Sequence, residues 1–177
     1  GPRRATDLAR RLAREAGALI SYDPNVRPGL WPEGRVDREL ILEGFDGSHL
    51  AKVSDEEWVA VTGAESFDEG AAVLFDRGVS LVVRSEGGAG ATMASPVASC
   101  HVDAPAVDVV EPTGAGDAAM ACLIAEVLPL HRAGRPLGEL DRPALEAMVR
   151  RATVVGALAC TRIGAIPSLP TSDEVNR

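Results

Sequence analysis

Short apolar runs alternate with segments of helical periodicity along most of this 177-residue chain. The runs at 18–22, 49–53 and 79–84 have the length and apolar character of buried strands. Because consecutive parallel strands need a long crossover, usually a helix, this order predicts a mostly parallel sheet with helices on both faces. Apolar residues make up 46% of the chain, which is enough for the core of one ordinary domain. We therefore expect one α/β domain over residues 1–177.

Capping residues and glycines delimit the helical segments between these strands. Thr6 and Ser54 are predicted to begin helices, and Gly17 and Gly78 are predicted to end them. A turn at 87–90 precedes two segments that we expect to form antiparallel strands, 91–94 and 97–103. The expected helices cover 6–16, 36–44, 55–63, 66–77, 115–128, 143–160 and 172–175.

Charge and cysteine content exclude several classes of protein. The net charge of −8 argues against nucleic acid as a partner, because a duplex binder needs a basic surface. The apolar stretches are too short and too interrupted to span a bilayer, so we expect no membrane partner and a cytoplasmic location. The cysteines are far apart and predict small buried side chains, not a structural zinc site: Cys100, Cys122 and Cys160.

Sheets of this kind bind their ligands beyond the carboxyl ends of the strands. Four segments of this chain are expected there: 23–27, 54–57, 85–90 and 113–117. The last of them belongs to the stretch "EPTGAGDAAM", in which two glycines bracket an alanine and an aspartate follows.

The chemistry of this stretch follows from its position at the start of a helix. Gly114 and Gly116 allow backbone N–H groups to point outward together, where the helix dipole is positive. Such a turn binds anions, phosphate in particular. Asp117 in the first helical turn stays ionised there and can accept a proton. An anion hole beside a carboxylate base suits phosphoryl transfer.

A bare GxGD stretch also fits a simple glycine turn followed by an acid that favours helix starts. The commoner nucleotide motifs do not decide between the two interpretations. The chain has neither the GxxxxGK[ST] loop nor a GxGxxG turn after a strand.

Five segments of the chain, in order, resemble the ribokinase-like (PfkB) carbohydrate kinases. "EPTGAGDAAMACLIAEVL" resembles their D-x-TGAGD signature, and "ALISYDPNVRPGLW" is similar to a turn of bacterial fructokinases and 2-keto-3-deoxygluconate kinases. "KVSDEEWVAVTG" resembles the N-x-x-E segment, "LVVRSEGGAGATM" the nucleotide loop, and "GALACTRIGAIPSLPTSDEV" the C-terminal end. The resemblance covers nearly the whole chain and implies a three-layer α/β/α ribokinase-like fold, with ATP and Mg²⁺ as cofactors and K⁺ as a further candidate.

The resemblance also implies roles for individual residues. Asp117 would be the catalytic base, with the backbone of Gly114, Ala115 and Gly116 as its anion hole. The residues expected to bind the nucleotide are Ser85, Gly87, Gly90, Thr113, Gly156 and Cys160, with Ala157 beside the last two. The residues expected to face the substrate are Asp23, Asn25 and Arg27. The residues expected near metal ions are Glu57, for magnesium and its water, and Glu111, Gly164 and Ser168, for a monovalent cation.

Some of these residues also fit a purely structural interpretation. Asn25 fits a turn cap, Arg27 a surface ion pair, and Glu57 a first-turn acid. Four positions depart from the family pattern: Ser54 in place of asparagine, Glu86 inside the nucleotide loop, Glu111 in place of aspartate, and Ala119 in place of an aromatic residue. Glu86 would repel phosphates if its side chain pointed inward.

The chain is also shorter than members of the family. It resembles their C-terminal portion and lacks the first strands, the β-lid and most of the sugar contacts. We therefore expect residues 1–177 alone to be poorly active and prone to associate, because a sheet without its first strands exposes an edge. In the full-length protein a homodimer is a further expectation.

Three interpretations of function remain open from the sequence. The first is a fructokinase-like sugar kinase, with fructose favoured over 2-keto-3-deoxygluconate and ribose. The second is a protein on the same fold that binds nucleotide without turnover. The third is an unrelated α/β protein with an anion site.

Overall fold

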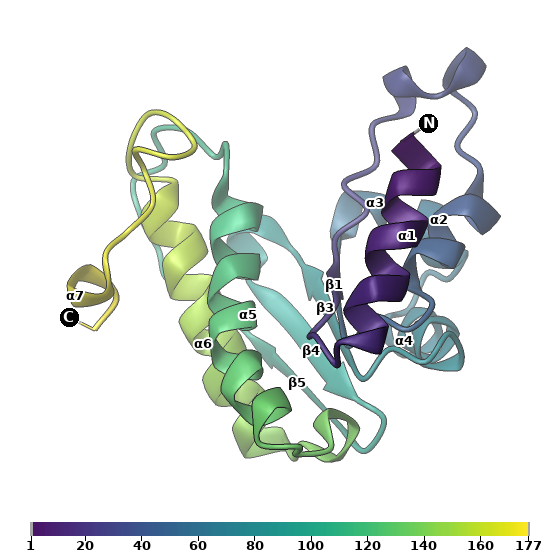
Figure 1. Cartoon of the computed structure of the whole chain (residues 1–177). Helices are drawn as coiled ribbons and strands as arrows, with labels where there is room; N and C mark the ends of the chain where they lie inside the picture. Colours follow the sequence, from purple (N-terminus) through teal and green to yellow (C-terminus); the bar gives the residue numbers. More distant parts are fainter. Residues whose placement is uncertain (1, 177) are drawn as a thin grey trace.

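The computed structural model describes residues 2–176 and shows a five-stranded sheet with helices on both faces (Figure 1). The strands lie side by side in chain order: β1 (Ser21–Tyr22), β2 (Leu50–Ser54), β3 (Leu81–Ser85), β4 (Ala91–Ser95) and β5 (Ala98–Val102). β1 pairs with β2, and β2 with β3, in parallel. The pairs β3 with β4 and β4 with β5 are antiparallel. The predicted α/β class and three-layer arrangement are therefore confirmed, together with the antiparallel pair after the turn.

The helices fall close to the predicted segments. They are α1 (Pro2–Glu15), α2 (Arg38–Phe45), α3 (Asp55–Thr62), α4 (Phe67–Asp76), α5 (Ala115–Arg132), α6 (Arg142–Ala159) and α7 (Ser172–Val175). Four short 3-10 turns complete the chain: η1 (Pro28–Leu30), η2 (Pro32–Gly34), η3 (Gly87–Ala89) and η4 (Leu137–Glu139). In the part of the chain that the structure describes, none of these helices has both the length and the apolarity that a bilayer span needs.

Several predicted boundaries were wrong. Thr6 lies inside α1 and does not begin it, because the helix extends four residues further towards the N-terminus, to residue 2. The predicted strand at 18–22 is reduced to two residues that pair with Leu50 and Ala51. Ser54 does precede α3, but its hydroxyl makes no capping hydrogen bond. α5 continues through Pro129 to Arg132, four residues further than predicted.

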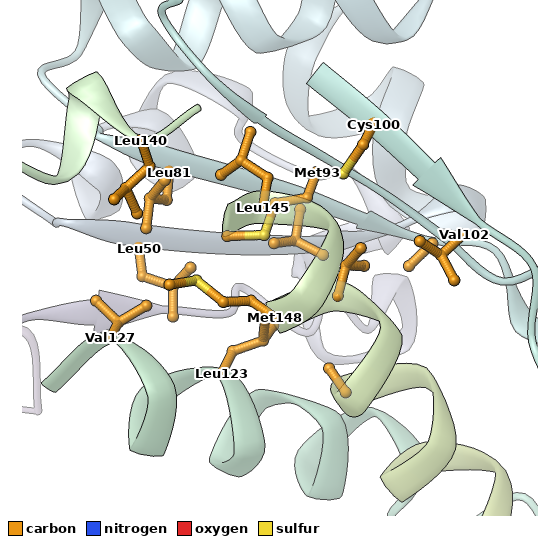
Figure 2. Packing of buried hydrophobic residues seen from close by; sticks show 14 of the residues in the cluster. Leu50, Leu81, Met93, Cys100, Val102, Leu123, Val127, Leu140, Leu145 and Met148 are labelled. Carbon is orange, nitrogen blue, oxygen red and sulfur yellow. The ribbon is translucent and has the colours of Figure 1, made fainter. Parts of the chain in front are cut away.

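The alternation of side chains along the strands divides the core into two clusters. One cluster lies between the sheet and the helices α5 and α6 (Figure 2). The strands contribute Leu50, Leu81 and Val83, and the helices contribute Leu123, Val127, Leu145 and Met148. The intervening residues Ala51, Val53 and Val82 face α2, α3 and α4 on the other side. Both faces of β2 and β3 are therefore buried, as a parallel α/β sheet requires, whereas β5 exposes Ser99 and His101 on one face.

Candidate active site

The GAGD turn, residues 113–117, lies at the upper end of the sheet in Figure 1, where α5 begins. Gly114 precedes the helix in the left-handed conformation with φ = 86°. A Cβ on Gly114 would lie 3.1 Å from the Cα of Ala165. Glycine is therefore required here both for its backbone angle and for the close approach of the C-terminal loop, residues 160–168.

Free backbone donors lie at the start of α5. Ala115 donates its N–H to the Pro112 carbonyl at 3.2 Å, and the first bond along the helix runs from Ala118 N–H to the Gly114 carbonyl at 2.8 Å. The N–H groups of Gly116 and Asp117 therefore have no acceptor within the helix. Asp117 is exposed in this first turn. The predicted base thus lies beside two outward-facing donors, while the N–H of Ala115 is already used.

Sequence reasoning missed one charged residue at this turn, Lys52 on β2. Its side chain is 5% exposed, and its Nζ lies 2.7 Å from Oδ2 of Asp23. A Cβ on Gly116 would lie 3.4 Å from the same Nζ. The sequence does indicate this position. Side chains alternate along a strand, so a lysine at position 52 of the buried run 49–53 lies on the same face as Leu50.

The β1 loop, residues 23–27, follows β1 and brings two further predicted residues together. Arg27 lies 3.6 Å from Oε1 of Glu57, with the arginine mostly exposed and the glutamate largely buried. Glu57 belongs to the first turn of α3, which begins where β2 ends. Asn25 is exposed and takes a left-handed angle, φ = 46°, as expected of a turn residue.

The β3 loop, residues 85–90, closes on itself after β3. The N–H of Glu86 donates to the Gly90 carbonyl at 2.8 Å, and Gly87 takes a positive φ of 55°. Gly90 is buried with φ = 106°, and a Cβ there would lie 2.0 Å from the carbonyl oxygen of Val102. Ser85 ends β3 on the face that carries Leu81 and Val83, so it lies on the side of the sheet that α5 covers.

The Glu86 side chain is held by neighbours on β3, β4 and β5. Its Oε1 accepts hydrogen bonds from Thr92 Oγ1 at 2.7 Å and from Arg84 Nε at 3.1 Å. His101 lies 3.7 Å from its other carboxylate oxygen. These contacts bind the negative charge within the sheet's own side chains, which removes the repulsion expected from an acid that points freely into a phosphate site.

The C-terminal loop is joined to the segment before the GAGD turn. The Cys160 carbonyl accepts the N–H groups of Val110 and Glu111, and the Glu111 carboxylate accepts the Gly164 N–H at 2.8 Å. The hydrogen bond from the Gly164 N–H lowers the pKa of Glu111, and a weaker effect in the same direction comes from the hydrogen bond with Thr113. Ser168 is fully buried, and its hydroxyl donates to the Ala165 carbonyl. Three residues predicted for a monovalent cation therefore lie in one loop cluster.

Two predicted nucleotide residues lie at the end of α6. A Cβ on Gly156 would lie 3.3 Å from the Ala115 carbonyl oxygen, so this glycine lets α6 approach the start of α5. Cys160 follows the last turn of α6, and burial raises the pKa of its thiol.

The predicted metal residues form two separate groups, because Glu57 pairs with Arg27 while Glu111 binds the C-terminal loop. Among residues 2–176, the structure has no cluster of three acidic, histidine or cysteine ligands.

Known proteins are similar to this chain both in sequence and in fold. Fructokinase-1 from Oryza sativa subsp. japonica is 35% identical over 168 residues, which is 94% of this chain and 50% of the rice protein. A double mutant of fructokinase from Vibrio cholerae O395, solved with fructose, ADP and potassium, superposes with a TM-score of 0.84 at 30% identity over 98% of this chain and 54% of its own. Fructokinase from Xylella fastidiosa, solved with ATP, superposes with a TM-score of 0.85 at 27% identity, over 97% and 54% of the two chains.

The chain spans about half the length of the curated relatives that it matches. The sequence profile of the pfkB family carbohydrate kinases matches residues 2–172, which is nearly the whole chain. With the GAGD turn at the start of α5 and the loops beyond β1, β2 and β3 around the same end of the sheet, the chain belongs to the pfkB family of carbohydrate kinases.

Proposed function

We propose that this chain is the ATP-binding and catalytic part of a fructokinase-like enzyme that phosphorylates a sugar hydroxyl. The observation that carries the proposal is the turn at the start of α5, where Asp117 is exposed and the N–H groups of Gly116 and Asp117 have no acceptor within the helix. Such donors stabilise the negative charge that develops on a transferred phosphoryl group. Family membership and the fructokinase relatives support the same reaction.

In the proposed mechanism, the Asp117 carboxylate removes the proton from the sugar hydroxyl. The hydroxyl oxygen then forms a bond to the γ-phosphorus of ATP, while the bond from that phosphorus to the bridging oxygen breaks and releases ADP. The N–H groups of Gly116 and Asp117 hold the transferred phosphoryl oxygens, and the positive end of α5 attracts their negative charge. The β3 loop and the end of α6 would hold the nucleotide.

Two sets of residues fit the metal ions that this reaction uses. Glu57 offers a largely buried carboxylate at the carboxyl end of β2, where it would help to hold Mg²⁺ and its water, and the ion would supply positive charge to the phosphates. Glu111 accepts the Gly164 N–H, and the Gly164 carbonyl accepts the Ser168 N–H, so oxygen atoms of this loop would be the ligands of a hard monovalent cation. In both places this chain provides oxygen ligands, which such ions prefer.

The β1 loop would face the sugar through Asp23, Asn25 and Arg27. We propose fructose as the substrate, because this segment resembles that of fructokinases, and 2-keto-3-deoxygluconate and ribose are the alternatives. A homodimer of the complete protein remains part of the proposal. Nucleotide binding without turnover is the competing function.

The test is ADP release by the complete gene product and, in parallel, by residues 1–177. Each protein is given ATP-Mg²⁺ with fructose, 2-keto-3-deoxygluconate or ribose. We expect sugar-dependent ADP release from the complete gene product, strongest with fructose, and little or none from residues 1–177. Nucleotide binding by both proteins without ADP release on any sugar would favour the competing function, and no nucleotide binding at millimolar ATP-Mg²⁺ would contradict both.

A further inference from the structure

Lys52 is the only lysine in the sequence, and it lies where a charged side chain is costly. Its side chain is 5% exposed on a strand whose neighbouring positions, Ala51 and Val53, belong to the core. Strand alternation turns it onto the opposite face, which Leu50 shares and α5 covers. Because an unpaired buried ammonium loses its hydration without compensation, a lysine at such a position needs a specific partner.

That partner is Asp23, the first residue after β1. Its Oδ2 lies 2.7 Å from Nζ of Lys52, and its side chain is 21% exposed. β1 and β2 are parallel neighbours, so their carboxyl ends lie next to one another at the same edge of the sheet. The ion pair therefore attaches the beginning of the β1 loop to β2, which is held between two other strands.

The same ammonium group is in contact range of the GAGD turn. A Cβ on Gly116 would lie 3.4 Å from Nζ. Gly116 does not have a positive φ, so its backbone angle does not require glycine. Because Gly116 has no side chain, the space next to the Lys52 ammonium stays open. Lys52 thus pairs with the first residue of the β1 loop and lies beside the turn that carries the proposed base.

We propose that Lys52 is a positioning residue that fixes the β1 loop relative to the GAGD turn by holding Asp23 while its ammonium lies beside Gly116. This role rests on the proposed kinase function, since it sets the distance between the sugar-binding loop and Asp117. Lys52 itself takes no proton and forms no bond in the reaction. Its loss allows the loop to shift, which weakens sugar binding and misaligns the hydroxyl with the base.

The first test uses residues 1–177 and does not depend on activity. Reductive methylation with ¹³C-formaldehyde labels only the amino terminus and Lys52, so the lysine gives a single side-chain NMR signal. An Arg135→Lys variant adds an exposed reference lysine in the same molecule. We expect Lys52 to be methylated at least about tenfold more slowly than the reference, and Asp23→Asn to raise its rate by about tenfold.

The matched control is Asp108→Asn, which removes an exposed carboxylate far from β2 in sequence and is expected to leave the rate unchanged. Gly116→Ala is expected to shift the Lys52 signal, because the new methyl group touches Nζ. If Asp23→Asn unfolds the chain, as seen by circular dichroism, adding Lys52→Met restores folding, because it removes the unpaired charge. Methylation of Lys52 as fast as the reference, or no response to Asp23→Asn in a folded chain, overturns the proposal.

The second test measures the kinetic role in the complete gene product. Lys52→Met is expected to raise the KM for the sugar by about tenfold and to lower kcat, with the KM for ATP within about twofold of wild type. Asp23→Asn changes the same parameters, and the double variant is no worse than the worse single variant. Equal losses for sugar and ATP, or wild-type kinetics, overturn the positioning role. If the wild-type protein phosphorylates no sugar, the proposed function fails, while the methylation result still decides whether Lys52 links the two segments.

Discussion

At the scale of single residues, the glycines around the site differ in what an added side chain would meet. Gly114 takes a left-handed angle and lies close to Ala165, whereas a Cβ on Gly116 would lie in contact with the ammonium of Lys52. Gly90 is the most constrained of them, because both its φ and the carbonyl of Val102 exclude a side chain. Gly88, two residues earlier, has open space around it.

Gly90→Ala therefore destabilises the protein far more than Gly88→Ala. The new methyl group would overlap a backbone oxygen, which is not the flexible end of a side chain, and φ = 106° is strained for alanine. We expect Gly90→Ala to lower the free energy of unfolding by about 3 kcal/mol or more, and Gly88→Ala to change it by about 0.5 kcal/mol or less. Urea denaturation of the two variants measures the difference, and equal stabilities would contradict this account of the β3 loop.

Asp117→Asn tests the base at the same scale. The amide keeps the size of the side chain but cannot accept the hydroxyl proton, so kcat for the sugar is expected to fall by about 10²–10⁴-fold. ATP binding depends on other groups and is expected to stay within about twofold. Asp108→Asn, an exposed substitution before the turn, serves as the control in the same ADP-release assay. A variant at position 117 that retains about a third of wild-type turnover is incompatible with a general base.

At the scale of elements, α7 illustrates how a very short helix is held in place. It has four residues, too few for helical propensity alone to stabilise it. Thr171 and Glu174 form a reciprocal capping box, and the Glu174 carboxylate also accepts a hydrogen bond from Arg162. These contacts lower the pKa of Glu174 to about 2, and the hydrogen bond from Arg162 has the largest effect.

The attachment of α7 is therefore expected to depend on pH in the acid range. A carboxylate whose pKa is lower in the folded state stabilises folding fully above its unfolded value of 4.5, and this contribution is lost as the pH falls towards 2. Amide signals of α7 measured by NMR should thus retain their folded positions at neutral pH and lose them progressively below about pH 4.5. Glu174→Gln should give the acid-like spectrum already at neutral pH, and Asp173→Asn should not.

At the scale of the whole molecule, the chain carries a sheet whose first strand is an edge. Among residues 2–176, β1 pairs with β2 on one side only, and it is two residues long. The helix that precedes it exposes Leu8 and Leu12, 46% and 53% accessible, which form one stripe of α1. Open edges and apolar stripes of this kind favour contact with further protein.

We expect residues 1–177 on their own to associate as their concentration rises. Replacing both Leu8 and Leu12 by lysine should reduce that association, because it adds charge to the apolar stripe without disturbing the core. Leu30→Lys is the control, since Leu30 is 86% exposed but lies in η1, away from α1 in sequence. Sedimentation velocity over a range of concentrations measures the effect. A monomer at all concentrations would show that the edge and the stripe attract no second copy.

The sequence by itself determined the order of elements and the start of α5. Strand and helix periods are local properties of neighbouring residues, so the runs at 49–53 and 79–84 and the helical segments between them could be located without coordinates. The GAGD turn could also be located from the local sequence, because two glycines at the start of an apolar helix favour a turn with free N–H groups. The resemblance to sugar kinases added the nucleotide and cation residues, which no spacing alone would have indicated.

Only the tertiary structure decided which of these residues meet. The ion pair between Lys52 and Asp23, the contact of Gly114 with Ala165 and the hydrogen bond from Gly164 to Glu111 each join segments far apart in the chain. The direction of the Glu86 side chain likewise depends on partners that β4 and β5 bring beside it. Local sequence specifies backbone conformation through sterics and side-chain period, whereas these contacts exist only after the strands and helices have packed, and the packing determines which charge finds which partner.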